Sequence, residues 1–296
     1  MILIGARLTL TPVGVRSALD GVDFLGGVIH GAVENLLRMR VPEIATALGI
    51  GTPNHIKPYA ILPPPFGWAA EPRGGELALP FGVALHGTAV RHAEAISLAL
   101  TDWREVRLAG RVDRVHAVAL SIGHPAGLSA QWSPGQPFPD TSSLAPLTTL
   151  PARNALVLRF LTPLVLTGSG RPAATAHERP PDLLRIVRAL RRRIESANPA
   201  LFCRLADSDW TSHEEAIRPL EASSARWQEV SWRYGSRTKN APISFRGHLG
   251  SLHFQTSDTA PIPGPIHTLL QWGTWFGVGQ RTALGQGMYI VQEGNP

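Results

Sequence analysis

The alternation of hydrophobic and polar residues divides the chain into two halves, and each half begins with a strand followed by a helix. In the first half, residues 2–10 alternate as in a strand buried on one face, and residues 26–40 change to a helical period. In the second half, residues 156–163 are typical of a strand and residues 182–195 of an amphipathic helix. The pattern therefore predicts the same strand–helix opening twice.

Each half later returns to strands. The segment Pro53–Pro80 is rich in proline and glycine and predicts an irregular excursion, whereas Pro134–Pro151 is the best candidate for a linker. The remaining pattern predicts a helix over 83–103, extended chain over 106–122, strands over 229–235 and 243–255, a helix over 264–273 and a strand over 287–292. This order indicates an α+β fold with two tandem ferredoxin-like domains, residues 1–150 and 151–296.

The charge of the chain favours a polyanionic partner. The formal net charge is +6, and 26 of the 28 basic residues are arginine, the lysines being Lys57 and Lys239. Arginine presents a planar fork of donors that suits phosphate oxygens and stacks on bases, whereas lysine is a compact, strongly hydrated charge. A GC-rich genome would explain much of the preference for arginine, but it would not explain the net charge. We therefore expect a surface that binds a polyanion.

Several other classes of protein are disfavoured. No apolar run approaches the roughly 18–20 residues that cross a bilayer, and the first residues resemble a strand rather than a secretory signal. Cys203 is the only cysteine, which excludes an intramolecular disulfide and any multi-cysteine metal site. We expect a cytoplasmic protein with no metal site and no other cofactor.

The helix predicted over 182–195 has two opposed faces. Apolar residues form one stripe, while Arg185, Arg188 and Arg192 fall on the other side at positions i, i+3 and i+7. A solvated helix face would also explain this pattern. However, arginines without interspersed glutamates repel one another, and a phosphate backbone would neutralise them. We expect these three arginines to contact RNA.

The segment 232–240, Trp-Arg-Tyr-Gly-Ser-Arg-Thr-Lys-Asn, combines cations with aromatic residues. It contains Arg237 and Lys239, and Arg246 follows on the next predicted strand. Bases can stack on Tyr or Trp while cations hold phosphate. The alternative is an ordinary hairpin loop with solvated charges.

A glycine-rich run lies near the C-terminus. It contains Gly277, Gly279, Gly285 and Gly287, with Arg281 between the two pairs. Glycine permits positive φ and allows backbone N–H groups to approach a phosphate closely. The run is not a dinucleotide-binding fingerprint, because it follows a helix and no βαβ unit comes after it. The alternative is that these glycines only form the turns of a hairpin.

These motifs, in this order, resemble the C-terminal half of the CRISPR repeat-cleaving endoribonucleases of the RAMP superfamily, whose hallmark is that glycine-rich loop. The resemblance covers about residues 150–292 and rests on Phe160-Leu161-Thr162-Pro163, the arginine-rich helix, Trp232…Ser236-Arg237-Thr238-Lys239, Gly247-His248-Leu249-Gly250 and Gly277-x-Gly279-x5-Gly285-x-Gly287. In the N-terminal half, the first strand and the segment Phe24–Ala32 resemble the family's first ferredoxin-like unit.

The resemblance implies two tandem ferredoxin-like (RRM-like) domains that bind the stem-loop of a CRISPR repeat. It also implies metal-independent cleavage at the base of the stem, in which the ribose 2′-OH attacks the adjacent phosphate. The products would be a 2′,3′-cyclic phosphate and a 5′-OH. The protein could then stay bound to the mature guide RNA within an effector complex that contains other subunits.

The chemistry needs a base for the 2′-OH, an acid for the leaving 5′-oxygen and cations for the extra phosphate charge. The family often uses a histidine near the first helix, and His30 lies there, at the edge between the apolar and polar sides. Arg38 lies about 12 Å further along the helix axis and is the second catalytic candidate. A structural role for His30 and an arginine-based site are both alternatives. His86, His92, His116 and His248 are further histidines, each better explained as structural.

Three functions therefore stand open. The sequence favours an endoribonuclease that matures CRISPR RNA, with a divergent, type IV-like variant among the subtypes. The second is a non-catalytic RAMP-type subunit that binds guide RNA without cutting it. The third is a basic structural RNA-binding protein outside CRISPR systems, which would show no preference for a repeat hairpin.

Overall fold

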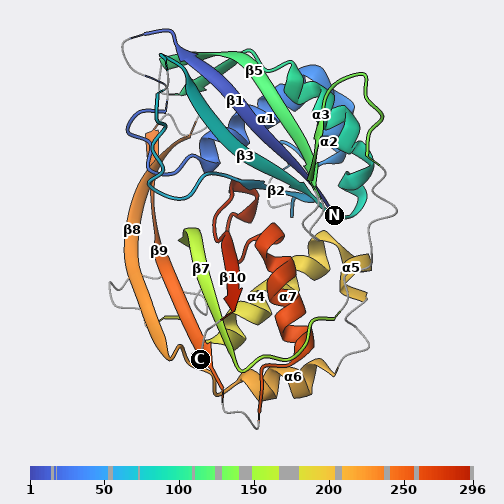
Figure 1. Cartoon of the computed structure of the whole chain (residues 1–296), viewed down its shortest axis with the longest axis vertical. Coiled ribbons are helices and arrows are strands. Elements are labelled where there is room, and N and C mark those ends of the chain that lie inside the picture. The colour runs from blue at the N-terminus through green and yellow to red at the C-terminus, as the bar shows by residue number, and fades with distance from the viewer. Residues whose placement is uncertain are drawn as a thin grey trace. The chain divides into compact units, whose positions relative to one another are not determined.

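The computed structural model describes residues 1–14, 17, 19–52, 56–72, 74–108, 111–123, 129–139, 149–166, 180–203, 209–236, 241–256 and 260–293. The chain forms two compact units. The first comprises Met1–Ala145, Trp232–Ser244 and Ala283–Gly285, and the second comprises Pro146–Ser231, Phe245–Thr282 and Gln286–Pro296. Each unit contains one sheet and its own helices (Figure 1). The assignment of residues 1–150 and 151–296 to two domains stays a prediction.

The sheet of the first unit has the order β2-β3-β1-β5-β4, and β6 also pairs with β5. Its strands are β1 (Ile2–Pro12), β2 (Tyr59–Leu62), β3 (Leu77–Leu85), β4 (Glu105–Leu108), β5 (Arg111–Gly123) and β6 (Ser129–Trp132). Its helices are α1 (Gly26–Arg40), α2 (Pro42–Ala47), the 3-10 turn η1 (Gly87–His92) and α3 (Ala93–Thr101). The path β1-α1-β2-β3-α3-β5, with β1 antiparallel to both β3 and β5, is ferredoxin-like.

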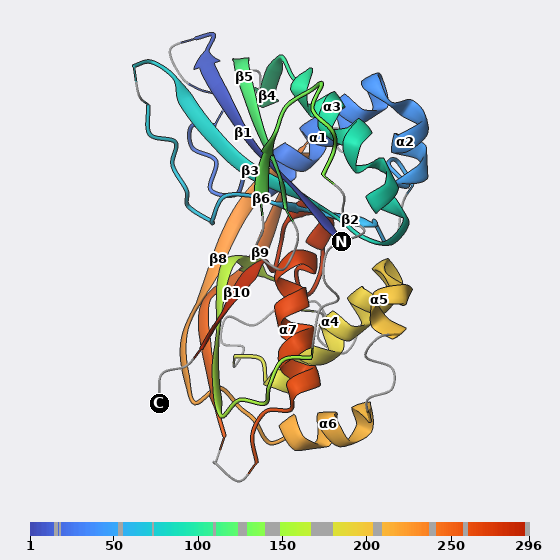
Figure 2. The same ribbon diagram turned by 45° about the vertical axis from the view of Figure 1, so that its right-hand side comes forward.

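The alternating pattern of β1 explains its central place. Ile4, Leu8 and Leu10 are fully buried, whereas Arg7 is exposed on the other face. Helix α1 buries Ile29 and Val33 in the same hydrophobic core. In Figure 2, α1, α2 and α3 cover one side of this sheet. The core therefore lies between one face of the sheet and these helices.

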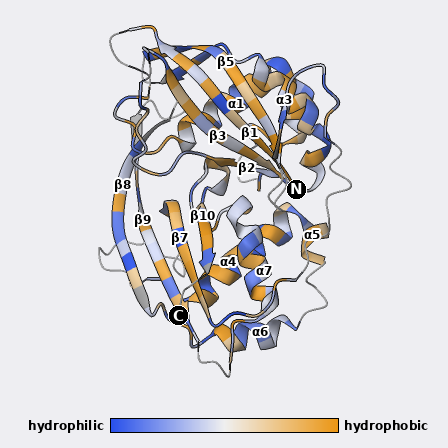
Figure 3. Cartoon of the chain, viewed as in Figure 1, coloured by the Kyte–Doolittle hydropathy of each residue, from blue (hydrophilic) through white to orange (hydrophobic). Residues whose placement is uncertain are grey.

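The second unit repeats the same path with fewer additions. Its sheet has the order β10-β7-β9-β8. The strands are β7 (Ala155–Leu164), β8 (Ser224–Ser236), β9 (Ala241–Gln255) and β10 (Tyr289–Glu293), and the helices are α4 (Leu183–Ala197), α5 (Pro199–Cys203), α6 (Trp210–Ile217), α7 (Gly264–Phe276) and the 3-10 turn η2 (Thr282–Leu284). The end of β8, the start of β9 and most of η2 belong to the first unit. The path β7-α4-β8-β9-α7-β10 is again ferredoxin-like. In Figure 3, β7 is largely hydrophobic and β8 largely hydrophilic.

A glycine allows the two long helices of the second unit to pack closely. A Cβ on Gly273 of α7 would lie 2.0 Å from the hydroxyl of Tyr289 and 2.7 Å from a methyl carbon of Leu190 on α4. The Tyr289 hydroxyl donates to the carbonyl oxygen of Leu270 at 2.7 Å, so this buried polar group is satisfied. Asp182 caps the N-terminus of helix α4, because its side chain accepts a hydrogen bond from the backbone N–H of Arg185.

The predicted fold class is confirmed, with errors in individual elements. The segment 83–103 is not one helix: β3 continues to Leu85, a 3-10 turn follows, and α3 begins only at Ala93. The excursion predicted over 53–80 contains β2 and the start of β3. A short apolar run buried in a sheet shows no helical or strand period of its own, so the pattern did not distinguish these states. Half of the predicted linker, 140–148, lies outside the described residues.

Candidate functional site

His30 lies in the second turn of α1, at the boundary that the sequence predicted. Only 12% of its side chain is exposed, because Tyr59 of β2 stacks beside it with the two ring centroids 5.9 Å apart. The preceding Ile29 is buried in the core, and the following Gly31 is exposed. The helix thus holds His30 at the rim of the core in the first unit.

A carboxylate on the next turn joins His30 and Tyr59 into one network. The hydroxyl of Tyr59 donates to Oε1 of Glu34 at 2.7 Å. Nε2 of His30 lies 3.3 Å from the Tyr59 hydroxyl and 3.4 Å from Oε1 of Glu34. We call these three residues the His30–Glu34–Tyr59 network.

The hydrogen-bond inventory of this network selects a tautomer of His30. The single hydroxyl proton of Tyr59 is used on Glu34, so the Tyr59 oxygen can only accept from His30. If Nε2 carries a proton, it can donate to the Tyr59 oxygen or to Oε1 of Glu34. If Nε2 carries none, it faces these two acceptors and can form a hydrogen bond with neither. Neutral His30 therefore carries its proton on Nε2 and leaves Nδ1 as its basic atom.

Burial and charge make His30 neutral at pH 7. Desolvation lowers its pKa below the ordinary value of 6.5, Glu34 opposes this, and the cations Lys57 and Arg38 lower it further. Burial and the carboxylate of Glu34 also raise the pKa of Tyr59, so its hydroxyl stays protonated. A neutral imidazole is able to accept a proton, as a general base must.

Arg38 and Lys57 complete the cluster in different ways. Arg38 donates to Oε2 of Glu34 at 3.1 Å, and half of its side chain is exposed. The sequence placed Arg38 and His30 far apart along the helix, but the structure connects both to the same carboxylate. Lys57 donates to the carbonyl oxygens of Gly49 and Thr52, so it closes a loop while its charge acts on His30.

The sequence did not indicate Glu34, Lys57 or Tyr59 as members of a site. Tyr59 lies in Tyr59–Leu62, a four-residue apolar strand inside the stretch that the proline content predicted to be irregular. The signal that could have found Glu34 was its position four residues after His30, on the same face of α1.

The C-terminal glycine-rich run reaches the first unit through Ala283–Gly285. A Cβ on Gly26, at the start of α1, would lie 2.1 Å from the carbonyl oxygen of Leu284. A Cβ on Gly285 would lie 2.7 Å from the carbonyl oxygen of Ile61 in β2. The glycine-rich run therefore packs its backbone against the two elements that carry His30 and Tyr59.

The other glycines of the run shape the loop itself. Gly277, Gly279, Gly285 and Gly287 all have positive φ, as does Arg281. The amides of Gly277 and Gly287 donate to the carbonyl oxygens of Gly273 and Pro163.

Arg281 is held by an aromatic ring. Its guanidinium carbon lies 4.4 Å above the ring centroid of Phe245, a cation–π contact within the second unit. Partial burial lowers the pKa of Arg281. The contact fixes the side chain while its outer edge stays exposed.

The arginine face of α4 exists, but part of it is neutralised. Arg188 and Arg191 donate to the two carboxylate oxygens of Glu214 on α6, at 2.9 and 3.1 Å. Arg192 donates to the carbonyl oxygen of Arg188, and Arg185 is half-buried. The helix has no glutamate interspersed among these arginines, as the sequence argument stated, but α6 supplies a carboxylate partner that the argument did not consider.

The aromatic segment before β9 is only partly available for stacking. Trp232 is 4% exposed and packs edge-on against Phe24 and Phe66, so it belongs to the core of the first unit. Arg246 lies 3.7 Å from the carboxylate of Glu229. Arg237 and Lys239 lie outside the described residues.

Two of the other histidines have structural surroundings. His86 is completely buried, and His248 stacks on Trp227 with the rings 5.5 Å apart and nearly parallel. Among the described residues, no group of three His, Cys, Asp or Glu side chains could hold a metal ion. Within that same part of the chain, no helix is both long and apolar enough to cross a membrane.

Comparison with known proteins supports the motif-based resemblance. Residues 158–289 match the family model described as CRISPR-associated endoribonuclease Cas6, and no curated protein matches the sequence. The chain is similar to Thermus thermophilus Cas6 (TTHB231), with 19% identity, a TM-score of 0.57 and 98% of each chain covered. It is also similar to a Cas6 (TTHB231) product complex, with 20% identity, a TM-score of 0.61, and 98% of this chain and 99% of that one covered.

A further similar structure is described as a RAMP protein binding different RNA substrates, with 13% identity, a TM-score of 0.51, and 98% of this chain and 100% of that one covered. The predicted resemblance to CRISPR repeat-processing endoribonucleases is confirmed over residues 158–289 by the family match. At such low identities the structural similarity establishes the tandem ferredoxin-like fold.

The charges around His30 predict opposite effects for two substitutions. Glu34→Gln removes the negative charge that raises the His30 pKa, so the pKa should fall further below 6.5. Arg38→Gln removes a positive charge that lowers it, so the pKa should rise. Titration of the His30 imidazole by NMR measures both. Shifts in the same direction, or no shift in either variant, would contradict the described network.

Proposed function

We propose that this chain is an endoribonuclease that cleaves CRISPR repeat stem-loops in precursor transcripts without a metal ion and retains the mature guide RNA. The observation that carries the proposal is a neutral, partly buried His30 in an ordered network, on a helix whose start contacts the glycine-rich run. The match of residues 158–289 to the Cas6 family supports the same reading, as does the similarity to a Cas6 product complex.

In the proposed reaction the 2′-oxygen attacks the adjacent phosphorus. A bond forms between O2′ and phosphorus, and the bond from phosphorus to O5′ of the next nucleotide breaks. The 2′-hydroxyl proton passes to Nδ1 of His30, the atom that the network leaves basic. The leaving 5′-oxygen takes up a proton from water, and the hydroxide that remains removes the proton from His30. The products are a 2′,3′-cyclic phosphate and a 5′-OH.

The cations of the cluster have a separate role. Arg38 is half exposed and holds only one oxygen of Glu34, so its remaining donors can bind a phosphate. Charge builds up on the phosphate in the transition state, and a fixed guanidinium stabilises it. Glu34 and Tyr59 are positioning residues, since they fix the tautomer and orientation of His30.

The second unit supplies the proposed RNA grip. Arg188 and Arg192 are exposed on α4, and Arg281 and Arg246 are exposed near the sheet. Phosphate contacts would compete with Glu214 for Arg188 and with Glu229 for Arg246. Further contacts are proposed for Arg185, Arg237, Lys239 and the backbone of Gly277, Gly279, Gly285 and Gly287. Other effector subunits could join the complex after cleavage.

A non-catalytic RAMP-type RNA-binding subunit is the second candidate. The limited exposure of His30, with Nε2 already engaged by Tyr59 and Glu34, favours it. The two functions share the RNA surface and differ only in whether Nδ1 of His30 reaches a 2′-hydroxyl. Intact repeat RNA after long incubation with tightly bound protein would select this second function.

Cleavage of the repeat hairpin should continue in EDTA, because the nucleophile is the ribose itself. A hairpin with a 2′-deoxy nucleotide just before the cut should bind with normal affinity and stay intact. End-group analysis should find the 2′,3′-cyclic phosphate and the 5′-OH. Normal cleavage of the deoxy substrate would refute attack by the 2′-oxygen.

His30→Ala should slow single-turnover cleavage by at least about 10²-fold, the usual cost of losing a positioned base. Its affinity for the hairpin should stay within a few-fold of wild type. The wild-type rate should fall only below pH 6.5, because a lowered pKa keeps His30 neutral above that value. Arg38→Ala should reduce both rate and affinity, since its guanidinium is proposed to hold phosphate.

The two single variants also separate the alternatives. If His30→Ala cuts at the wild-type rate and Arg38→Ala is inactive, the site is arginine-based and His30 is structural. If neither variant is slower, the catalytic group lies outside α1, and Tyr234, Lys239 and His248 become the next candidates.

The arginine face of α4 should appear in the salt dependence of binding. Replacing Arg188 and Arg192 together by alanine should weaken hairpin binding and flatten the log–log salt slope by about one or two. Arg104→Ala with Arg107→Ala is the matched control, because these exposed arginines are paired with Asp102 and Glu105. An unchanged salt slope in the α4 variant would show that this helix face is solvated and does not contact RNA phosphates.

A further inference from the structure

The sheet of the second unit has an open face with a groove. The groove has a volume of about 1180 Å³, and all of the residues that line it belong to this unit. Along β7, Leu156, Leu158 and Phe160 are buried, while Val157 and Arg159 alternate with them. In Figure 2, α4 and α7 lie on one side of this sheet, so the alternate positions face away from them.

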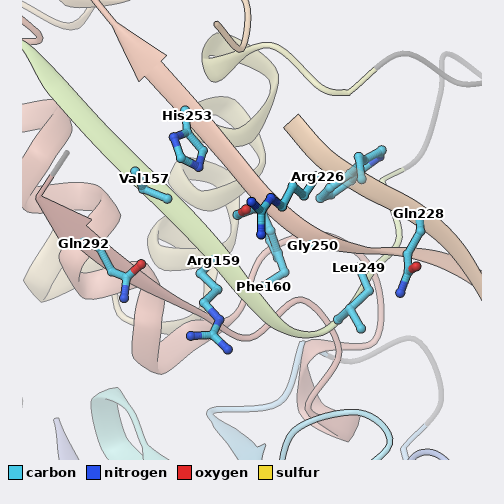
Figure 4. A pocket seen from close by; sticks show the side chains of 11 residues that line it. Val157, Arg159, Phe160, Arg226, Gln228, Leu249, Gly250, His253 and Gln292 are labelled. Atoms are coloured by element: carbon cyan, nitrogen blue, oxygen red, sulfur yellow. The ribbon is translucent and has the colours of Figure 1, made fainter. Parts of the chain in front are cut away.

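Strand register brings the polar groups of the groove onto one face. Val157 pairs with His253 on β9 and with Gln292 on β10, and Arg159 pairs with Ser251. Residues opposite each other in a sheet point to the same side. Figure 4 shows Arg159, His253 and Arg226 lying on one side of the sheet, from β7, β9 and β8.

The groove has positive charge without a balancing carboxylate. Its described lining includes Arg159 and Arg226 and no acidic residue. Both arginines are exposed, and neither has a hydrogen-bond or ion-pair partner among the described residues. Two of the arginines proposed to hold RNA differ, since Arg188 is paired with Glu214 and Arg246 with Glu229. Two unpaired guanidinium groups over one groove are suited to an anion that comes from outside the chain.

The rest of the lining suits bases better than a simple anion. Gln228, Gln292 and Ser251 offer donors and acceptors, and His253 adds a ring. Arg159 and Arg226 lie on strands two positions apart in the order β7-β9-β8, which is about 10 Å at the usual strand spacing. A ligand with repeated phosphates and intervening bases fits this spread of groups.

We propose that the groove binds a single-stranded segment of RNA, with phosphates on Arg159 and Arg226 and base edges on the neighbouring amides. A duplex fits less well, because pairing occupies the Watson–Crick edges of its bases and its major groove is too deep and narrow for side chains to read. The inference rests on the proposed function only for the source of the strand, which is the unpaired RNA beside the repeat hairpin. This open face of the sheet would then bind the unpaired RNA beside the repeat hairpin rather than the hairpin itself.

The test uses the full chain and a labelled oligouridylate of about ten nucleotides, a typical length for one single-strand binding module. Arg159→Ala with Arg226→Ala should weaken binding by at least about ten-fold in fluorescence anisotropy. The log–log salt slope should fall by about 1.4, since each phosphate contact to a single strand contributes about 0.7. The control, Arg104→Ala with Arg107→Ala, should bind like wild type.

Photo-crosslinking gives an independent readout on the wild-type protein. With 4-thiouridine in the oligonucleotide, crosslinks should fall within 226–228 or 249–253. Crosslinks found only elsewhere, or an unchanged affinity and salt slope in the double variant, overturn the proposal. Displacement of the RNA by an equal concentration of oligoglutamate would also overturn it, in favour of an acidic protein segment.

The result is separable from the endoribonuclease proposal. Oligouridylate forms no hairpin, so its binding does not depend on cleavage. If the wild-type protein does not cut the repeat hairpin but the double variant still loses oligouridylate binding, the endoribonuclease proposal is wrong and the groove proposal stands. If the wild-type protein cuts the hairpin normally but the double variant binds oligouridylate as tightly as wild type, the groove proposal is wrong and the endoribonuclease proposal stands.

Discussion

The carboxylate of Glu34 is the interaction on which the candidate site depends. It accepts the Tyr59 hydroxyl, lies beside Nε2 of His30 and binds Arg38. Without it, the protons of this network have no common acceptor, and the imidazole could adopt either tautomer. A partly buried carboxylate with three partners is stable because each of its charged or polar contacts compensates for lost solvation. One side chain therefore sets the proton positions and the orientation of the proposed base, while burial keeps that base neutral.

The two ferredoxin-like units use their sheets and helices differently. In the first unit, α1 and β2 carry the candidate site, and the backbone of Ala283–Gly285 packs against both. In the second unit, the arginines lie on α4, on the glycine-rich loop and over the open face of the sheet. Repetition of one fold thus gives a proposed chemical site and a proposed RNA surface. The glycines matter because a Cβ on Gly26 or Gly285 would lie less than 3 Å from a carbonyl oxygen of the neighbouring segment.

Charge alone was an incomplete guide to the proposed RNA surface. The sequence selected Arg185, Arg188 and Arg192 because they share a helix face, yet Glu214 from α6 neutralises part of that face. It did not select Arg159 or Arg226, because single arginines in strands form no pattern along the chain. Those two are unpaired in the described part of the structure, and only the pairing of β7, β9 and β8 brings them to one groove. Trp232 shows the opposite error, since its neighbours suggested base stacking and it is buried against Phe24.

The sequence by itself determined the α+β class, the repeated strand–helix opening, the position of α1 and the glycine-rich run, because these follow from local period and backbone freedom. It also placed His30 at the edge of the core. Tertiary structure decided which groups surround that histidine: Tyr59 comes from a strand 29 residues away in a stretch without a readable period. It also decided which arginines are paired. Ion pairs and proton networks depend on distances between elements, and a one-dimensional pattern carries no information on those distances.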